Sequence, residues 1–84
     1  MGQLEKAKKR LKSEPSDYTF KEAESLLISL GFKEHNKGKS SGSRVVFIRD
    51  NVKIMLHKPH PQKEIKKYAV SQLKEQLEKL GELQ

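Results

Sequence analysis

Two of the three histidines lie close together in the segment His57-Lys58-Pro59-His60-Pro61. An imidazole exchanges a proton near neutral pH, so each of the two could serve as a general acid or base. His60 is the first candidate, because Pro59 and Pro61 restrict the backbone on both sides of it, and His57 is the second. The alternative is structural: His60 fills a turn or caps the helix that follows.

Basic side chains surround these histidines in the sequence. Lysine ammonium groups bind phosphate oxygens and stabilise the negative charge that builds up when a phosphodiester is cleaved. We therefore expect an RNA-binding surface here. Its candidate residues are Lys58, Lys63 and Lys66. We expect no metal and no other cofactor, because the chain has no cysteine and no converging carboxylate pair beside the histidines.

The segment 37–43 is rich in glycine, serine and lysine and could also hold phosphates. Glycines let backbone amides approach an anion closely, and the lysines add positive charge. Gly38-Lys39-Ser40 resembles the end of a nucleotide-binding loop, but that pattern requires glycine at position 33, where Lys33 stands. We therefore expect binding to the phosphates of a longer polymer; a solvated loop without a ligand is the alternative. The candidate residues are Lys37, Lys39, Gly42 and Ser43.

The positive charge of the chain is concentrated in residues 33–67. This segment holds ten of the 18 Lys and Arg residues but three of the 11 Asp and Glu residues, so it accounts for the whole net charge of +7. A positive field confined to one part of a fold is typical of a protein that binds a polyanion such as RNA. The alternative is that the charge only keeps a small protein in solution.

The length of 84 residues allows one domain with a small core, so any chemistry is expected on the surface. The absence of cysteine excludes disulfides and indicates a reducing compartment, and we therefore expect a cytoplasmic protein. No segment is long and apolar enough to span a membrane, and the first residues contain no export signal or lipidation motif. We expect no membrane association.

Apolar spacing and capping residues predict two helices, in which apolar residues recur every three or four positions. Thr19 and Glu22 form a capping box at the start of the first helix, and Gly31 provides its left-handed C-terminal cap. Gly81 ends the second helix in the same way. The expected helices cover residues 20–30 and 64–80.

Between these helices the apolar pattern changes to a period of two, which predicts strands. They are expected at residues 32–36, 43–49 and 52–57. Asp50-Asn51 separates the last two by two residues that tolerate positive φ, so a tight antiparallel hairpin is expected. The fold class is therefore α+β, in the order helix, three strands, helix.

Residues 1–17 precede the expected domain, residues 18–84, as an extension. Leu4, Ala7 and Leu11 recur at helical spacing, so a short helix is expected. This helix could dock on the domain, dimerise or fray.

The second strand predicts that both faces of the sheet are covered. Val45 and Phe47 would point to one face and Val46 and Ile48 to the other, whereas a half-solvated strand alternates apolar with polar residues. The helices would cover one face. The extension, a second copy of the chain in a homodimer, or another protein would cover the other. The alternative is that Val46 and Ile48 are only modestly exposed.

Four short motifs together resemble the HicA toxins of bacterial and archaeal toxin–antitoxin modules. They are Gly31-Phe32, Gly42-Ser43-Arg44, Pro59-His60-Pro61 and Leu80-Gly81, in the family's order and spacing over about residues 19–83. The resemblance implies a fold like that of a double-stranded-RNA-binding domain, α-β-β-β-α, with a three-stranded antiparallel sheet and both helices on one face. It also implies a toxin that cleaves mRNA and is neutralised by the antitoxin HicB.

The chain departs from that family at the position where the resemblance implies the catalytic histidine. That histidine follows Gly-Ser, and here Gly42-Ser43 is followed by Arg44. A guanidinium stays protonated near neutral pH, so Arg44 can bind a phosphate but cannot be a general base.

Three functions stay open. The first is an endoribonuclease in which His60 or His57 transfers the proton and Arg44 stabilises the scissile phosphate. The second is an RNA-binding relative with weak or no nuclease activity, and the third is a protein-interaction domain for an acidic partner such as an antitoxin.

Overall fold

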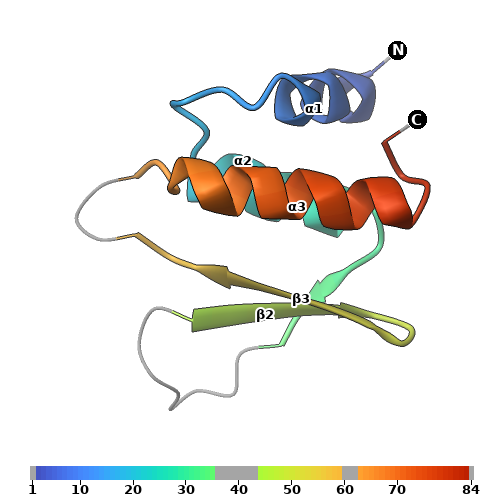
Figure 1. Cartoon of the computed structure of the whole chain (residues 1–84). Coiled ribbons are helices and arrows are strands. Elements are labelled where there is room, and N and C mark those ends of the chain that lie inside the picture. The colour runs from blue at the N-terminus through green and yellow to red at the C-terminus, as the bar shows by residue number, and fades with distance from the viewer. Residues whose placement is uncertain (1, 36–43, 60–62, 84) are drawn as a thin grey trace.

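The chain forms three helices and a three-stranded antiparallel sheet, with two helices before the strands and one after them (Figure 1). The computed structural model describes residues 2–35, 44–59 and 63–83. The elements are α1 (Gln3–Lys12), α2 (Phe20–Ser29), β1 (Lys33–Glu34), β2 (Arg44–Arg49), β3 (Val52–His57) and α3 (Lys67–Lys79). The α+β class and the order helix, three strands, helix are confirmed, with α1 preceding them. Among the helices of the described residues, none has the length and hydropathy that crossing a membrane requires.

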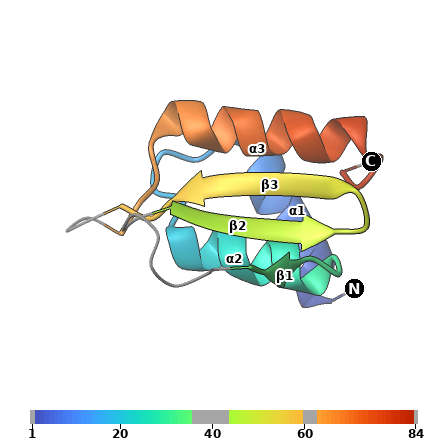
Figure 2. The same ribbon diagram turned by 90° about the horizontal axis from the view of Figure 1, so that it is seen from below.

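The elements are stacked in three layers. Helices α2 and α3 lie next to each other on one face of the sheet, and α1 lies on the outer side of these two helices (Figures 1 and 2). Leu11 of α1 is completely buried, and Leu4 and Ala7 pack against the same core. The prediction that the N-terminal extension could cover the open face of the sheet is therefore wrong. Its apolar residues contact the helical layer instead.

Two polar clusters hold α1 on the helices. The guanidinium of Arg10 donates hydrogen bonds to the carboxylate of Glu22 in α2. After α1 ends, Glu14 accepts a hydrogen bond from the Ser71 hydroxyl at 2.7 Å and pairs with Lys74 at 3.2 Å, both in α3. The hydrogen bond from Ser71 and the contact with Lys74 lower the pKa of Glu14 below its usual value. The extension is therefore joined to both helices by charged groups as well as by apolar packing.

Helix α2 begins at the predicted residue, ends at Ser29, one residue before the predicted end, and has both predicted caps. Thr19 Oγ1 accepts a hydrogen bond from the Glu22 amide at 3.1 Å, and the Glu22 carboxylate accepts one from the Thr19 amide at 2.9 Å. At the other end Gly31 has a φ of 97°, and the Phe32 amide donates to the Leu27 carbonyl at 2.9 Å. These contacts form a capping box and a Schellman motif. Helix α3 ends in a Schellman motif too.

The first strand is shorter than predicted. It was expected over 32–36, but β1 covers Lys33–Glu34, and residue 36 lies outside the described part of the chain. Phe32 is buried and its amide is bound in the turn that ends α2, so it is not available for strand pairing. The turn therefore delays the start of the strand.

Helix α3 begins at Lys67 and not at residue 64 as predicted. The preceding segment is extended, because Glu64 forms an antiparallel bridge with Thr19. The Phe20 amide donates to the Lys63 carbonyl at 3.1 Å, on one side of this bridge. Pairing with the start of α2 thus replaces the expected first helical turn.

The sheet has the strand order β1-β2-β3, and the tight hairpin at Asp50-Asn51 is confirmed. Asp50 adopts a φ of 54°, as such a turn requires. Val45 and Phe47 are buried against the helices. Val46 and Ile48 are partly exposed on the opposite face, which no element of the described residues covers.

Candidate functional site

Arg44 and His57 face each other at one end of the sheet. They are direct partners in the register of β2 and β3, and both are exposed. Their side chains point away from the helices, because the neighbouring pair Val45 and Leu56 is buried on the helix side. Residues directly opposite each other in antiparallel strands have Cβ atoms about 4.5–5.5 Å apart. The hairpin therefore presents a guanidinium beside an imidazole at the surface.

Three lysines predicted to bind RNA are exposed near the same end of the molecule, where β3 ends and α2 and α3 begin (Figure 1). Lys58 follows β3, and its Nζ atom is 5.8 Å from the ring centre of Phe20. The carbonyl of Lys63 accepts the hydrogen bond from the Phe20 amide. Lys66 lines a groove together with His57. The fold thus brings these lysines to the Arg44–His57 end.

The N-terminus of α3 has no acidic residue in its first turn. Lys66 is the N-cap residue and makes no side-chain cap hydrogen bond, and Lys67 is the first helical residue. The helix dipole and the unpaired amides of a helix start favour an anion and disfavour lysines. A phosphate bound there would satisfy these amides and offset the repulsion.

Several residues of the predicted site lie outside the described part of the chain. They are His60, Lys37, Lys39, Gly42 and Ser43. Their roles stay predictions. Segment 36–43 is followed directly by Arg44, and segment 60–62 comes three residues after His57. Both segments are therefore attached to the strand ends that carry the Arg44–His57 pair.

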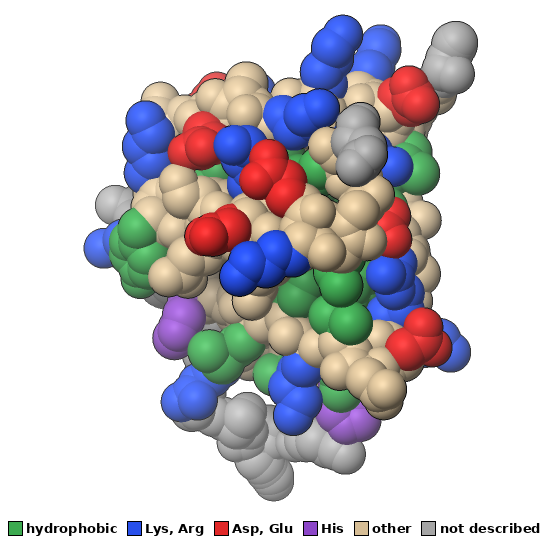
Figure 3. Space-filling view, turned by 45° about the vertical axis from the view of Figure 1, so that its right-hand side comes forward, with side chains coloured by type: hydrophobic (Ala, Val, Ile, Leu, Met, Phe, Trp, Pro, Cys, Tyr) green, Lys and Arg blue, Asp and Glu red, His purple; other side chains and the backbone are tan. Residues whose placement is uncertain are grey.

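The face of the sheet turned away from the helices combines apolar and basic residues, and we call it the open face. Its described members from β2 and β3 are Arg44, Val46, Ile48, Lys53, Met55 and His57. Met55 is 46% exposed. Neither strand contains an acidic residue, and most acidic side chains visible in Figure 3 lie in its upper half, over the helical layers. The open face therefore suits a partner with acidic groups around an apolar centre.

A groove of about 410 Å³ lies between β3 and α3, next to His57. Lys53 and Met55 belong to its β3 wall, and Tyr68 and Gln72 belong to its α3 wall. Tyr68 is 62% exposed. Tyr68 and Gln72 are not among the residues predicted from the sequence, because only the apolar stripe of the last helix was used to predict that helix. Their spacing of four residues was the signal, since it places both on one side of a helix.

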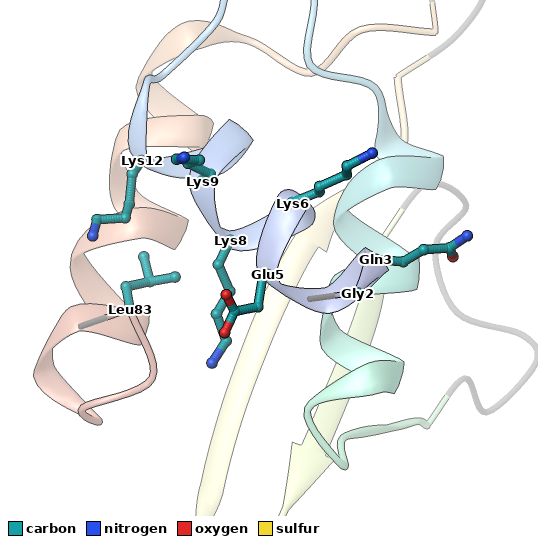
Figure 4. A pocket seen from close by; sticks show the side chains of 8 residues that line it. All are labelled: Gly2, Gln3, Glu5, Lys6, Lys8, Lys9, Lys12 and Leu83. Carbon is teal, nitrogen blue, oxygen red and sulfur yellow. The ribbon is translucent and has the colours of Figure 1, made fainter.

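A larger hollow, of about 780 Å³, lies between α1 and the C-terminal segment (Figure 4). Lysines of α1 and Leu83 line it. Figure 4 shows that Lys6 points away from Lys8 and Lys12, so these ammonium groups do not converge on one centre. Among the described residues that line this hollow there is no histidine, so it does not combine lysines with an imidazole as the Arg44–His57 end does.

The chemistry available at the Arg44–His57 end is phosphate binding and proton transfer. Arg44 offers a planar set of donors that fits a phosphate, and His57 offers an imidazole, the side chain most often used for proton transfer in catalysis. Within residues 2–35, 44–59 and 63–83, no group of three or more His, Asp and Glu side chains comes together that could hold a metal ion. The described residues therefore support polyanion chemistry at a surface.

A family model described as the HicA toxin of bacterial toxin–antitoxin systems matches residues 20–80. No curated protein and no solved structure matches the chain. The matched segment begins with α2 and ends just after α3, so it includes the sheet and the groove and omits α1.

Proposed function

Because the chain belongs to the HicA toxin family, we propose that it is the RNA-cleaving component of a type II toxin–antitoxin pair. The Arg44–His57 pair carries this proposal, since a phosphate-binding group and a proton-transfer group face each other on an exposed surface. Lys66 and the start of α3 lie beside His57 and add positive potential. Cleavage of a phosphodiester requires both of these functions.

In the proposed reaction Arg44 and the nearby lysines bind the scissile phosphate. An imidazole takes the proton of the ribose 2′-hydroxyl, and the 2′-oxygen attacks the phosphorus atom. The 5′-oxygen of the next nucleotide leaves and takes a proton from a second group, which yields a 2′,3′-cyclic phosphate and a 5′-hydroxyl. His57 and His60 are the candidates for the two proton transfers, because a guanidinium is not suited to act as a general base.

Substitution of the histidines tests this mechanism. Purified chain, free of any partner, is incubated with mixed RNA, and both cleavage and retention of the RNA are measured. His57→Ala and His60→Ala should each lower the cleavage rate by about 10²–10⁴-fold while RNA binding stays close to wild type. His35→Ala is the matched control, since this exposed histidine follows β1. Full cleavage by both test variants would contradict the proposal.

A second candidate function, RNA binding without cleavage, is favoured by one observation: Arg44 stands where the resemblance implies a histidine. Arg44→His separates the two candidates. If Arg44 stabilises the scissile phosphate in an intact mechanism, this substitution should lower cleavage by about 10²–10³-fold. If the position has lost its catalytic group, the same substitution should create cleavage in a chain that otherwise only binds RNA.

We also propose that the open face receives the antitoxin. Val46, Ile48 and Met55 form its apolar centre, and Arg44 and Lys53 lie around them. An acidic partner fits this face better than a second copy of the chain, because two copies of net charge +7 repel each other. Arg44→Glu should therefore slow association with the antitoxin more than it speeds dissociation; an unchanged association rate would contradict this assignment.

A further inference from the structure

The groove between β3 and α3 has the chemistry of a nucleobase-binding site. Its lining includes Lys53, Met55 and His57 from β3 and Tyr68, Gln72 and Gln76 from α3. The volume of about 410 Å³ is at the lower end of the range for small-ligand sites, about 300–1,000 Å³. A single flat base is a ligand of suitable size.

The α3 wall of the groove is an aligned row of three side chains. Tyr68, Gln72 and Gln76 follow one another at intervals of four residues, so they lie along one side of the helix. Val70 and Leu73 are buried on the core side of the same helix. Tyr68 is not needed for the core, since 62% of its surface is exposed. The row therefore offers an aromatic ring and amide groups to a ligand.

The charge of the groove favours a phosphate-bearing ligand. Its described lining residues include Lys53, His57 and Lys66 and no acidic residue. His57 also belongs to the Arg44–His57 pair, so the groove continues directly from the proposed cleavage site. In Figure 3 a histidine, basic side chains and hydrophobic side chains lie next to one another at the lower left of the molecule. A ligand in the groove would thus be close to a phosphate bound at the pair.

We propose that this groove binds one unpaired nucleobase of the RNA, next to the scissile phosphate. Tyr68 stacks on the base, Gln72 forms hydrogen bonds with its edge, and Lys66 binds the adjoining phosphate. Aromatic stacking combined with basic residues and amide donors is the usual means of binding single-stranded RNA, whereas paired bases in a duplex are not available for stacking. This inference rests on the proposed function for the identity of the substrate, and it adds that the substrate is single-stranded at the cleavage site.

The exposed edge of β3 offers a different ligand class, an acidic peptide that pairs as an additional strand. Binding of such a peptide would use the backbone of β3 but would give no role to the row of side chains on α3. The aligned Tyr68 and Gln72 side chains therefore favour the base over the peptide.

Tyrosine fluorescence gives a direct test, because the chain has two tyrosines and no tryptophan. Tyr18 is 1% exposed and Tyr68 is 62% exposed, so a base that stacks on the protein surface should quench Tyr68. The probes are a short single-stranded 2′-O-methyl RNA, which lacks the nucleophilic hydroxyl, and the same RNA in a perfect duplex. The single strand should quench the wild-type fluorescence on binding, and Tyr68→Phe should bind it without that quenching.

Binding affinities of the variants complete the test. Tyr68→Ala should weaken binding of the single strand between about 5-fold and about 100-fold and should change duplex binding less than twofold. Gln72→Ala should weaken it too, whereas Gln3→Ala, an exposed glutamine of α1, is the matched control and should have no effect. Circular dichroism of each variant checks the fold.

The outcomes separate this inference from the proposed function. Equal binding of the single strand by wild type and Tyr68→Ala would overturn the base site, and cleavage lost only in the histidine variants would still support the nuclease. Absence of RNA binding by the wild type would overturn both. Binding of an acidic peptide that Tyr68→Ala leaves unchanged, with no fluorescence quenching by RNA, would assign the groove to a protein instead.

Discussion

The substitution Leu11→Ala tests whether α1 is part of the cooperative fold. Leu11 is completely buried against the helical layer, although the family match begins only at residue 20. The substitution removes three buried carbon atoms, and at about 0.8 kcal/mol each this loses about 2.4 kcal/mol of transfer free energy. The remaining cavity adds a further cost, so that such substitutions lower the free energy of unfolding by about 2.7–5 kcal/mol.

We expect a loss near the lower end of this range, about 3 kcal/mol, because the surroundings of α1 have room to relax. A hollow of about 340 Å³ lies beside the helix, lined by Ala7, Arg10 and Tyr18 among others. A chain of 84 residues has a total free energy of unfolding of about 4–13 kcal/mol. The loss is therefore a large share of the total, and it corresponds to a fall in Tm of roughly 12–24 °C.

Urea unfolding followed by far-ultraviolet circular dichroism measures this loss, since the chain has no tryptophan to report on it. Ile28→Ala in α2 is the matched control: Ile28 is 50% exposed, and its substitution should change the free energy of unfolding by less than about 0.5 kcal/mol. If Leu11→Ala lowers the free energy of unfolding by no more than this control does, the prediction that α1 is part of the cooperative fold is refuted. Such a result would mean that α1 detaches before the rest of the molecule unfolds.

Three further predictions concern caps, pH and salt. Thr19→Ala removes one half of the capping box and should lower the free energy of unfolding by about 1 kcal/mol in the same urea assay. The pKa of Glu14 is lowered by Ser71 and Lys74, and the pKa of Glu22 is lowered by hydrogen bonds from Arg10 and Thr19 that outweigh the opposing effect of desolvation. Both carboxylates therefore stabilise the fold at pH values above their usual pKa of 4.5, and this stabilisation is lost as the pH falls below that value. The urea midpoints measured at acidic and at neutral pH should therefore differ less in Glu14→Gln than in the wild type. Lys66→Ala should reduce the slope of log K against log salt concentration for single-stranded RNA by about 0.7, measured by titration at several salt concentrations, and an unchanged slope would exclude a phosphate contact.

The parts of the fold that the sequence predicted are those decided by neighbouring residues. The capping box joins Thr19 and Glu22 across a single helical turn, and Gly31 adopts its positive φ within the same helix end. The hairpin at Asp50-Asn51 likewise depends on two residues and their flanking strands. Such signals act over a few positions, so a short segment of sequence contains all the information they need.

The parts of the fold that differed from the prediction depend on contacts between residues that are far apart in the chain. Helix α3 starts late because Glu64 pairs with Thr19, and no local pattern near residue 64 indicates that partner. The position of α1 depends on contacts of Leu11 and Arg10 with helices that follow later in the sequence. Its thin apolar stripe predicted a helix but could not indicate the layer that the helix covers.

The candidate site was partly accessible from the sequence. A two-residue hairpin loop fixes the strand register, and continuing that register from Arg49 and Val52 leads directly to Arg44 opposite His57. The groove was not accessible in this way. Tyr68 lies across from β3 only because α3 packs beside that edge strand, which is a property of the folded chain.

A partner on the open face would also control the groove, because three residues belong to both. Lys53, Met55 and His57 lie on the open face and line the groove as well. An antitoxin that buries these three side chains would cover the imidazole and one wall of the proposed base site together. Inhibition of RNA binding then requires no contact with α3 and no conformational change. The antitoxin and the RNA would compete for one end of β3, where the hairpin brings Arg44 and His57 together.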